Sequence, residues 1–224
     1  MVLEFFRGGS RGLMDEVQET LVQMLRDGND VFNTSLDALF GGGRSKATKR
    51  EVKSTDRGIN AMQAEVRRAL VTHAAVNPAD LPLVLQYASI VKDAERVGDY
   101  AKNLYDLVLY GASFDGAPDE DQLDGYRVAV SNLILEAADV FAAFDAERAR
   151  ALIGKADAFL DDYDDRVREQ FSFEGDTADA VARALYYRFL QRTTAHVMNV
   201  LTALVQPLDR LDYYDEVKDD RLPE

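Results

Sequence analysis

The amino-acid sequence predicts an all-α protein made of six long helices in two groups of three. Three observations support this fold class. Apolar residues recur at spacings of three and four along almost the whole chain, which is the period of one face of an α-helix. Alternating runs of β-branched residues, which indicate strands, are scarce. Glycine and proline residues gather at a few places, and these places divide the chain into helix-length segments.

The clearest helix is expected between Pro78 and Gly111. Its apolar residues alternate strictly at spacings of three and four, which predicts a narrow apolar seam facing antiparallel neighbours. The seam residues are Val84, Tyr87, Val91, Ala94, Gly98, Ala101, Tyr105 and Val108. Asn77 before Pro78, or Asp80 before Leu81, is expected to cap the start of this helix. Gly111 is expected to end it in a left-handed conformation.

The other five helices are expected at residues 13–40, 45–73, 124–144, 146–171 and 177–208. Glycines at positions 8–12 and 41–43 flank the first of them, and Asp145 and Asp176 are placed as N-caps. The segment 111–123, rich in Asp and Gly, is the predicted linker. We therefore expect one three-helix bundle in residues 1–112 and a second in residues 113–224, the second ending in a charged tail.

The two halves align with each other, which predicts an internal duplication. Residues 95–104 placed over 191–200 superimpose Arg96 on Arg192 at an offset of 96 residues, and the apolar seam positions stay apolar. The second helices align independently, with Asp56 over Asp157. We expect pseudo-symmetric bundles.

Composition and charge exclude several classes of protein. A chain of 224 residues with 47% hydrophobic and 29% charged residues is expected to be globular. The absence of Cys excludes disulfide scaffolds, zinc sites with Cys ligands and thiol nucleophiles. A net charge of −14 argues against a nucleic-acid binder and against anionic membrane surfaces. With neither a signal peptide nor a long apolar stretch in the sequence, we expect a cytoplasmic protein without membrane insertion.

Carboxylates at helical spacing form the candidate metal site. Glu95 and Asp99 lie one turn apart on the third predicted helix, and Asp56 and Asn60 repeat this spacing on the second. If the two helices pack side by side, the four side chains form an oxygen-rich cage suited to magnesium, calcium, manganese or iron. The alternative is a solvated, charged helix face.

At this point the chain resembles a known family. Residues 93–104, DAERVGDYAKNL, resemble the E-R-x-G-D-x-x-x-N signature of the PhoU family, regulators associated with phosphate uptake. Residues 52–65 and 77–81 are similar to the segments that precede the signature in that family. The resemblance extends over residues 13–208.

The resemblance implies a pair of three-helix bundles related by pseudo-twofold symmetry and packed like spectrin repeats, each able to hold a metal cluster. By this resemblance, the ligands of the first-half cluster would be Glu95, Asp99 and Asp56, with Asn60 as an additional ligand. The second half departs from the pattern. Its partner motif is kept as Asp157 and Asp161, whereas Gln191 and Ala195 replace the acids of the facing helix. Losing two carboxylates removes most of the attraction for a cation, so we expect a divalent or iron cluster in the first half only.

Basic residues cluster once in this acidic chain, around the start of the second predicted helix. They are Arg44, Lys46, Lys49, Arg50, Lys53 and Arg57. A solvated helix face is the simplest interpretation, and a contact for an acidic partner or for phosphate is the functional one. Of the two histidines, His196 beside the apolar seam is expected to be a hydrogen-bonded core residue, and His73 a partner of the helix C-terminus.

No catalytic motif is present, so we expect a protein that is not an enzyme. The resemblance implies a cytoplasmic regulator of phosphate homeostasis that docks on a phosphate transporter component, ATPase or permease, or on a sensor histidine kinase. A homo-oligomer is expected. The alternatives are an accessory subunit of another ion transporter, and a metal store or metal-dependent hydrolase that uses the carboxylate cage.

Overall fold

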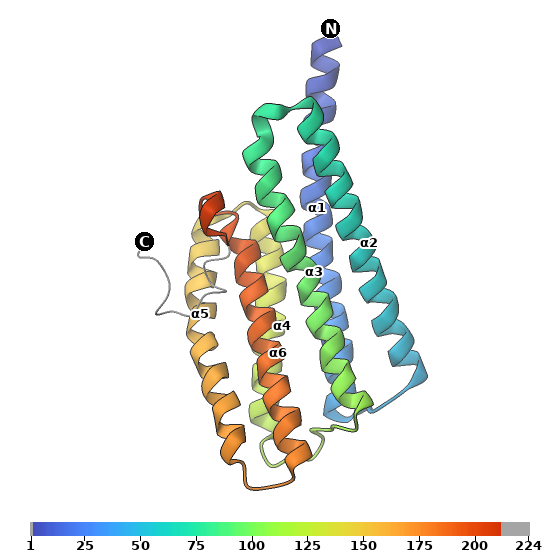
Figure 1. Cartoon of the computed structure of the whole chain (residues 1–224), viewed down its shortest axis with the longest axis vertical. Coiled ribbons are helices and arrows are strands. Elements are labelled where there is room, and N and C mark those ends of the chain that lie inside the picture. Colours follow the sequence, from blue (N-terminus) through green and yellow to red (C-terminus); the bar gives the residue numbers. More distant parts are fainter. Residues whose placement is uncertain (1, 212–224) are drawn as a thin grey trace.

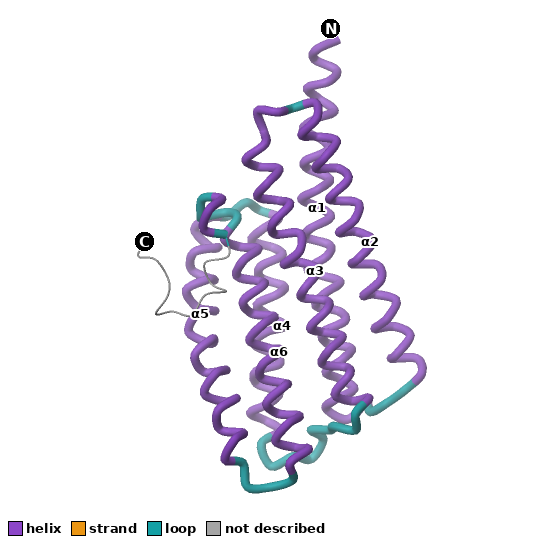
Figure 2. The backbone as a smooth tube through the Cα atoms, in the orientation of Figure 1, coloured by secondary structure: helices purple, strands orange, loops and turns teal. Residues whose placement is uncertain are grey.

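The computed structural model describes residues 2–211, with side chains from residue 12 onward, and the charged tail predicted at the C-terminus lies from residue 212 on outside the described residues. Six long helices run up and down along one axis, and the chain over these residues contains no strand (Figures 1 and 2). They are α1 (Val2–Asp37), α2 (Lys46–Val76), α3 (Leu81–Leu109), α4 (Glu120–Ala142), α5 (Ala146–Glu169) and α6 (Thr177–Thr202). The predicted fold class is confirmed.

The helices form two groups that meet through their central members. Helices α1, α2 and α3 pack together, as do α4, α5 and α6. Between the groups, α3 lies against α6 and α1 lies against α4, so that α2 and α5 are left on the two outer flanks (Figure 1). None of the helices between residues 2 and 211 combines the length and apolar character needed to cross a bilayer.

Several helix ends lie where the sequence predicted them. Asp145 accepts a hydrogen bond from the Arg148 amide, and Asp176 accepts one from the Ala178 amide, as N-caps do. The α2 helix has Ser45 as its N-cap. Gly111 follows α3 at φ 98°, a left-handed conformation that favours glycine.

Several predicted ends differ from the structure. Helix α4 begins at Glu120 rather than near residue 124, and α6 ends at Thr202 rather than near residue 208. Helix α1 begins at Val2 rather than near residue 13, because scattered glycines weaken a helix by about 1 kcal/mol each without breaking its hydrogen bonds. Asp80 precedes α3 without capping it. Its carboxylate pairs instead with His73 Nε2 at 2.9 Å, in the last turn of α2, so His73 is tied to the next helix across the short Pro78–Asp80 turn.

The predicted seam of α3 is buried along its whole length. At Gly98 the neighbouring helix comes very close, since an added Cβ would lie 2.7 Å from Ile59 Cδ1 of α2. Glycine at this position lets the two helices approach closely. Because Asp56 lies one turn before Ile59 and Asp99 directly follows Gly98, this close approach also brings acids of both helices together.

The linker between the two groups is anchored by specific side chains. Phe114 is buried and packs edge-to-face against Phe40 of the first group and Tyr186 of the second. Asp119 pairs with both the Nε and an Nη atom of Arg183, at 3.0 and 2.7 Å. A segment that the sequence indicates only as a break therefore joins the two helical groups.

The contacts between α3 and α6 follow the offset of the internal repeat. Tyr100 stacks on His196, which is its equivalent 96 residues later. By the same offset, Asp93 is equivalent to Phe189 and Tyr100 to His196. Asp93 contacts His196, and the equivalent pair, Phe189 and Tyr100, is also in contact. The two helices thus cross with pseudo-twofold symmetry in which one contact is a histidine–carboxylate hydrogen bond and its counterpart is aromatic.

Candidate functional site

Three of the four predicted ligands gather between α2 and α3. Asp56 comes from α2, and Glu95 and Asp99 come from α3; their side chains are 14%, 13% and 24% exposed. Lys102, one turn beyond Asp99, places its Nζ 2.9 Å from an oxygen of Asp56 and 3.3 Å from an oxygen of Asp99. We call Asp56, Glu95, Asp99 and Lys102 the carboxylate cluster.

Arg96 adds a second cation at the edge of the cluster. Its guanidinium lies 3.0 Å from Asp99 and 3.9 Å from Glu95. Burial raises the pKa of Glu95 above its ordinary value, the charge of Asp99 raises it further, and the cations only partly offset these effects. The carboxyl of Glu95 therefore keeps its proton to a higher pH than an exposed glutamate, mainly because it is buried.

Lys102 holds its proton firmly in this setting. Burial acts to lower the pKa of Lys102, but hydrogen bonds and charge from Asp56 and Asp99 outweigh it and raise the pKa. The ammonium group thus lies between two of the oxygens that an ion would use. As arranged, the described side chains do not assemble three His, Cys, Asp or Glu ligands around one point. A bound ion requires Lys102 to leave, and metal occupancy stays a prediction.

The remaining predicted ligand lies apart from the cluster. Asn60 is exposed, and its amide nitrogen donates to the backbone carbonyl of Asp56 in its own helix.

In the second half, Asp157 is half-buried and Asp161 is exposed on α5. On the facing wall, Gln191 donates to the carbonyl of Leu160, and the position equivalent to Lys102 is the buried Met198. This wall therefore lacks the two acids and the lysine of the first half, and Arg188 donates to Gln191 instead.

The predicted basic cluster lies on the first turns of α2, with Arg44 just before that helix. Arg44, Lys46, Arg50, Lys53 and Arg57 are exposed and Lys49 is half-buried. Within the part of the chain that the structure describes, no carboxylate forms an ion pair with any of these six. We call Arg44, Lys46, Lys49, Arg50, Lys53 and Arg57 the basic face.

Sequence reasoning missed a polar group between the two bundles. Asp93 of α3 is buried and accepts hydrogen bonds from His196 Nδ1 at 2.8 Å and from Asn199 at 3.1 Å. His196 Nε2 in turn lies 3.4 Å from Arg192, which also donates to the Tyr100 hydroxyl. His196 is thus the hydrogen-bonded core residue that the sequence predicted. The sequence could not predict Asp93 as the partner of His196, because nothing in it distinguishes Asp93 from the other acids of a charged helix.

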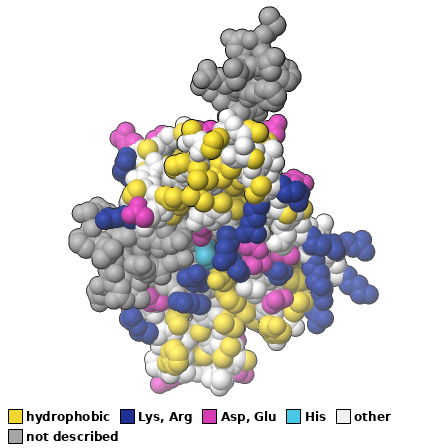
Figure 3. Space-filling model, turned by 45° about the horizontal axis from the view of Figure 1, so that its top comes forward, with side chains coloured by type: hydrophobic (Ala, Val, Ile, Leu, Met, Phe, Trp, Pro, Cys, Tyr) yellow, Lys and Arg dark blue, Asp and Glu magenta, His cyan; other side chains and the backbone are white. Residues whose placement is uncertain are grey.

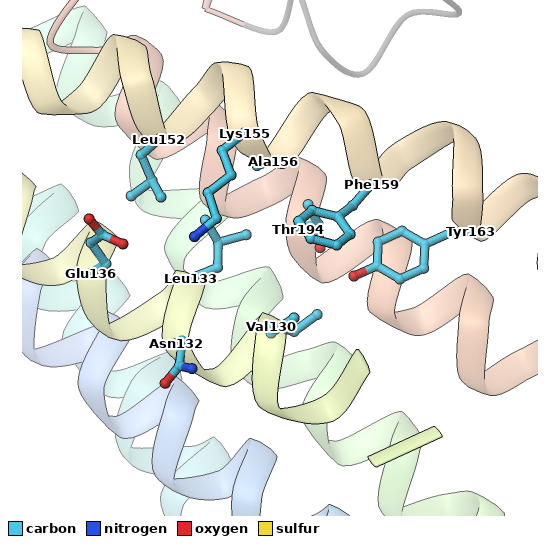
Figure 4. A pocket seen from close by; sticks show the side chains of 11 residues that line it. Val130, Asn132, Leu133, Glu136, Leu152, Lys155, Ala156, Phe159, Tyr163 and Thr194 are labelled. Carbon is cyan, nitrogen blue, oxygen red and sulfur yellow. The ribbon is translucent and has the colours of Figure 1, made fainter. Parts of the chain in front are cut away.

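A small apolar pocket lies between α4 and α5 in the second bundle. Figure 4 shows Leu133 and Val130 of α4 opposite Phe159 and Tyr163 of α5, with Thr194 of α6 behind them. The hollow has a volume of about 90 Å³. Its lining is mainly hydrophobic, so it does not suit a charged ligand.

Fold and surfaces together define a helical-bundle protein with two pseudo-symmetric halves and distinct charged surfaces. Residues 21–108, which span the second half of α1, all of α2 and α3 up to its last residue, match the family model of the PhoU domain. Over these residues the chain is therefore similar to PhoU domains.

Similar proteins extend the match beyond that domain. The chain is 26% identical over 152 residues to a phosphate-specific transport system accessory protein PhoU homolog of Synechocystis, covering 66% of this chain and 67% of that protein. It is 28% identical over 189 residues to a protein of the same description from Pseudomonas aeruginosa, covering 79% and 74%. The crystal structure of the phosphate transport system regulatory protein PhoU from Streptococcus pneumoniae has a TM-score of 0.74 at 18% identity. It covers 93% of this chain and 97% of that one, so both bundles share the fold.

Proposed function

We propose that this protein regulates phosphate uptake from the cytoplasm by docking on a phosphate transporter component or a sensor histidine kinase, and that it acts by binding rather than by catalysis. The observation that carries the proposal is the PhoU domain of residues 21–108. The names of the relatives, which describe accessory proteins of phosphate-specific transport, support the same direction.

The basic face supplies the proposed contact. Six cations without ion-pair partners among the described side chains stand on a chain of net charge −14. Unpaired surface cations attract an acidic partner surface and speed its association. The basic face occupies the first turns of the outer helix α2, where a partner has access from the side away from the second bundle (Figure 1).

Docking regulates a transporter when it favours one of the transporter's states. The free energy by which docking shifts the equilibrium between the two states equals the difference in binding free energy between them. A long rigid helical surface that fits only one state is therefore sufficient. A homo-oligomer belongs to the same proposal, because two copies would present two basic faces to one assembly.

A direct binding measurement tests the docking. The purified chain is immobilised, and the phosphate-transport ATPase subunit and the phosphate sensor kinase encoded in the same genome are passed over it. We expect one of them to bind, and the triple variant K49E, R50E, K53E to weaken that binding at least tenfold with increased salt sensitivity of the remainder.

A scattered triple variant serves as the control. Arg68, Arg150 and Lys155 are exposed on other parts of the surface, and changing all three to Glu alters the net charge equally. Equal weakening by both variants would contradict a specific basic face, and no binding of either partner would contradict the docking proposal itself.

A further inference from the structure

A hollow between the two bundles is lined by cations from three helices. Arg67 comes from α2, Lys92 and Arg96 from α3, and Arg192 from α6. The hollow has a volume of about 540 Å³, and Ser89 and Tyr100 add hydroxyl groups to its wall. Figure 3 shows Lys and Arg side chains beside a histidine near the middle of this face. We call this the inter-bundle pocket.

Among its described lining residues, the inter-bundle pocket has more cationic than acidic side chains. Among the described residues of its wall, Asp93 is the one carboxylate, and this acid is already engaged by His196 and Asn199. Arg96 is paired with Asp99, so the excess of positive charge rests on Arg67 and Lys92 alone, on a chain whose net charge is −14. The pocket is therefore a local exception to the acidic field of the molecule.

Two of these cations are not used by the described fold. Arg67 and Lys92 have no carboxylate within ion-pair distance among residues 12–211. Arg96, by contrast, pairs with Asp99, and Arg192 donates to Tyr100. The packing of the helices does not require the charges of Arg67 and Lys92. A negatively charged ligand would explain why both cations line the same pocket.

The arrangement of the arginines favours a tetrahedral oxyanion. Arg96 and Arg192 are equivalents in the internal repeat, so α3 and α6 bring one guanidinium each from the two halves to the same pocket. A guanidinium group can donate two parallel hydrogen bonds to two oxygens of one phosphate, and an ammonium group adds a compact point charge. A dianion that touches both helices would also hold the two bundles together.

We propose that the inter-bundle pocket binds a phosphate group, either as orthophosphate or as the phosphoryl end of a small soluble phosphate ester. The proposal rests on the pocket alone and is independent of the docking function, because it needs neither the basic face nor a protein partner. Binding of the anion at the junction of the bundles would change how firmly α3 and α6 are joined.

Calorimetric titration of the full-length chain tests this proposal. Orthophosphate, AMP, sulfate and chloride are titrated at matched ionic strength. We expect one orthophosphate or one AMP to bind per chain, sulfate to bind more weakly, and chloride to give no heat. Binding of AMP without orthophosphate would identify a phosphate ester as the ligand. Equal heats for all four anions, or none for both phosphates, would overturn the proposal.

Paired variants locate the site. The double variant R67A, K92A should weaken phosphate binding at least tenfold while the thermal unfolding midpoint stays unchanged, since both side chains are exposed. The matched control R50A, K53A removes the same charge from the basic face of α2 and should stay within twofold of the unmodified chain. Equal weakening by both double variants, or by neither, would overturn the assignment to this pocket.

Discussion

Lys102 is the residue that decides the chemistry of the carboxylate cluster. Its ammonium group lies within hydrogen-bond distance of Asp56 and Asp99, in the space that a metal ion would share with them. A cation supplied by the chain needs no ligand from solution and neutralises the same two oxygens. The cluster thus acts as an ion-paired link between α2 and α3.

Removing this ammonium should expose the metal-binding capacity of the cluster. We expect K102M to bind Mn²⁺ at least tenfold more tightly than the unmodified chain, because three acids would then face one arginine. Titration followed by electron paramagnetic resonance measures the affinity. K53M, which removes an exposed lysine of the same helix as Asp56, is the control. Stoichiometric metal on the unmodified chain after dialysis would contradict the role given to Lys102.

Glu95 gives the cluster a pH dependence. Its pKa is higher in the folded protein than in the unfolded chain, so the folded state binds its proton more tightly. This stabilisation is complete below the ordinary glutamate pKa and is lost as the pH rises through the raised value.

We therefore expect E95Q to raise the free energy of unfolding at pH 7 and to lose this advantage near pH 4. Urea unfolding at both pH values measures the difference. E65Q, on the exposed side of α2, is the charge-matched control and should show little change. A destabilised E95Q at pH 7 would mean that the contact of Glu95 with Arg96 outweighs its burial.

At the residue scale, spacing predicted which acids meet but not what neutralises them. Glu95, Asp99 and Asp56 converge because their positions on α2 and α3 follow from helical periodicity. Lys102 is on the same face by the same rule, yet nothing in a single sequence distinguishes a lysine that turns inward from one in solvent.

Among the elements, α3 sets the geometry of the molecule. Its seam packs against α1 and α2, and its other side meets α6. The sequence predicted this helix well because apolar spacing records burial directly. It could not predict the pairing with α6, since that surface mixes Asp93, Tyr100 and Arg96, which resemble a solvated face.

Gly98 is the close-contact position of α2 and α3. We expect G98A to lower the free energy of unfolding by about 1 kcal/mol, because overpacking against Ile59 exceeds the helix-propensity gain of alanine. Shortening the obstructing side chain should relieve this, so the cost of I59V together with G98A should be smaller than the sum of the two single costs. Denaturant unfolding measures all three variants.

The same substitution elsewhere separates packing from propensity. Gly154 in α5 has no atom within 4 Å of an added Cβ, so G154A should stabilise the protein by roughly 0.5–1 kcal/mol. Strictly additive costs for G98A and I59V would contradict the close approach of α2 and α3.

For the whole molecule, the central observation is that two equivalent halves have different chemistry. Offsets of the repeat superimpose Arg96 on Arg192 and Tyr100 on His196, and these residues meet where the halves join. The second half has Gln191 and Met198 in place of Glu95 and Lys102, so the charges that form the carboxylate cluster are missing from it. The sequence predicted this difference between the halves, because an alignment of the halves shows which acids the second half lacks.

The joining of the halves was not readable from the sequence. Phe114 and Asp119 sit in a segment that composition marks only as a turn, yet they bind it to both bundles. Contacts between residues far apart in the chain leave no local sequence pattern. The sequence therefore predicted the two bundles but not the contacts that join them.

Deletion of the encoding gene, followed by phosphate uptake in phosphate-rich medium, tests the regulatory role most directly. We predict that uptake stays high in the deletion strain, that the unmodified chain restores its restriction, and that K49E, R50E, K53E fails to do so at equal protein level. Uptake that is unchanged by the deletion at every phosphate concentration would contradict a role in phosphate control.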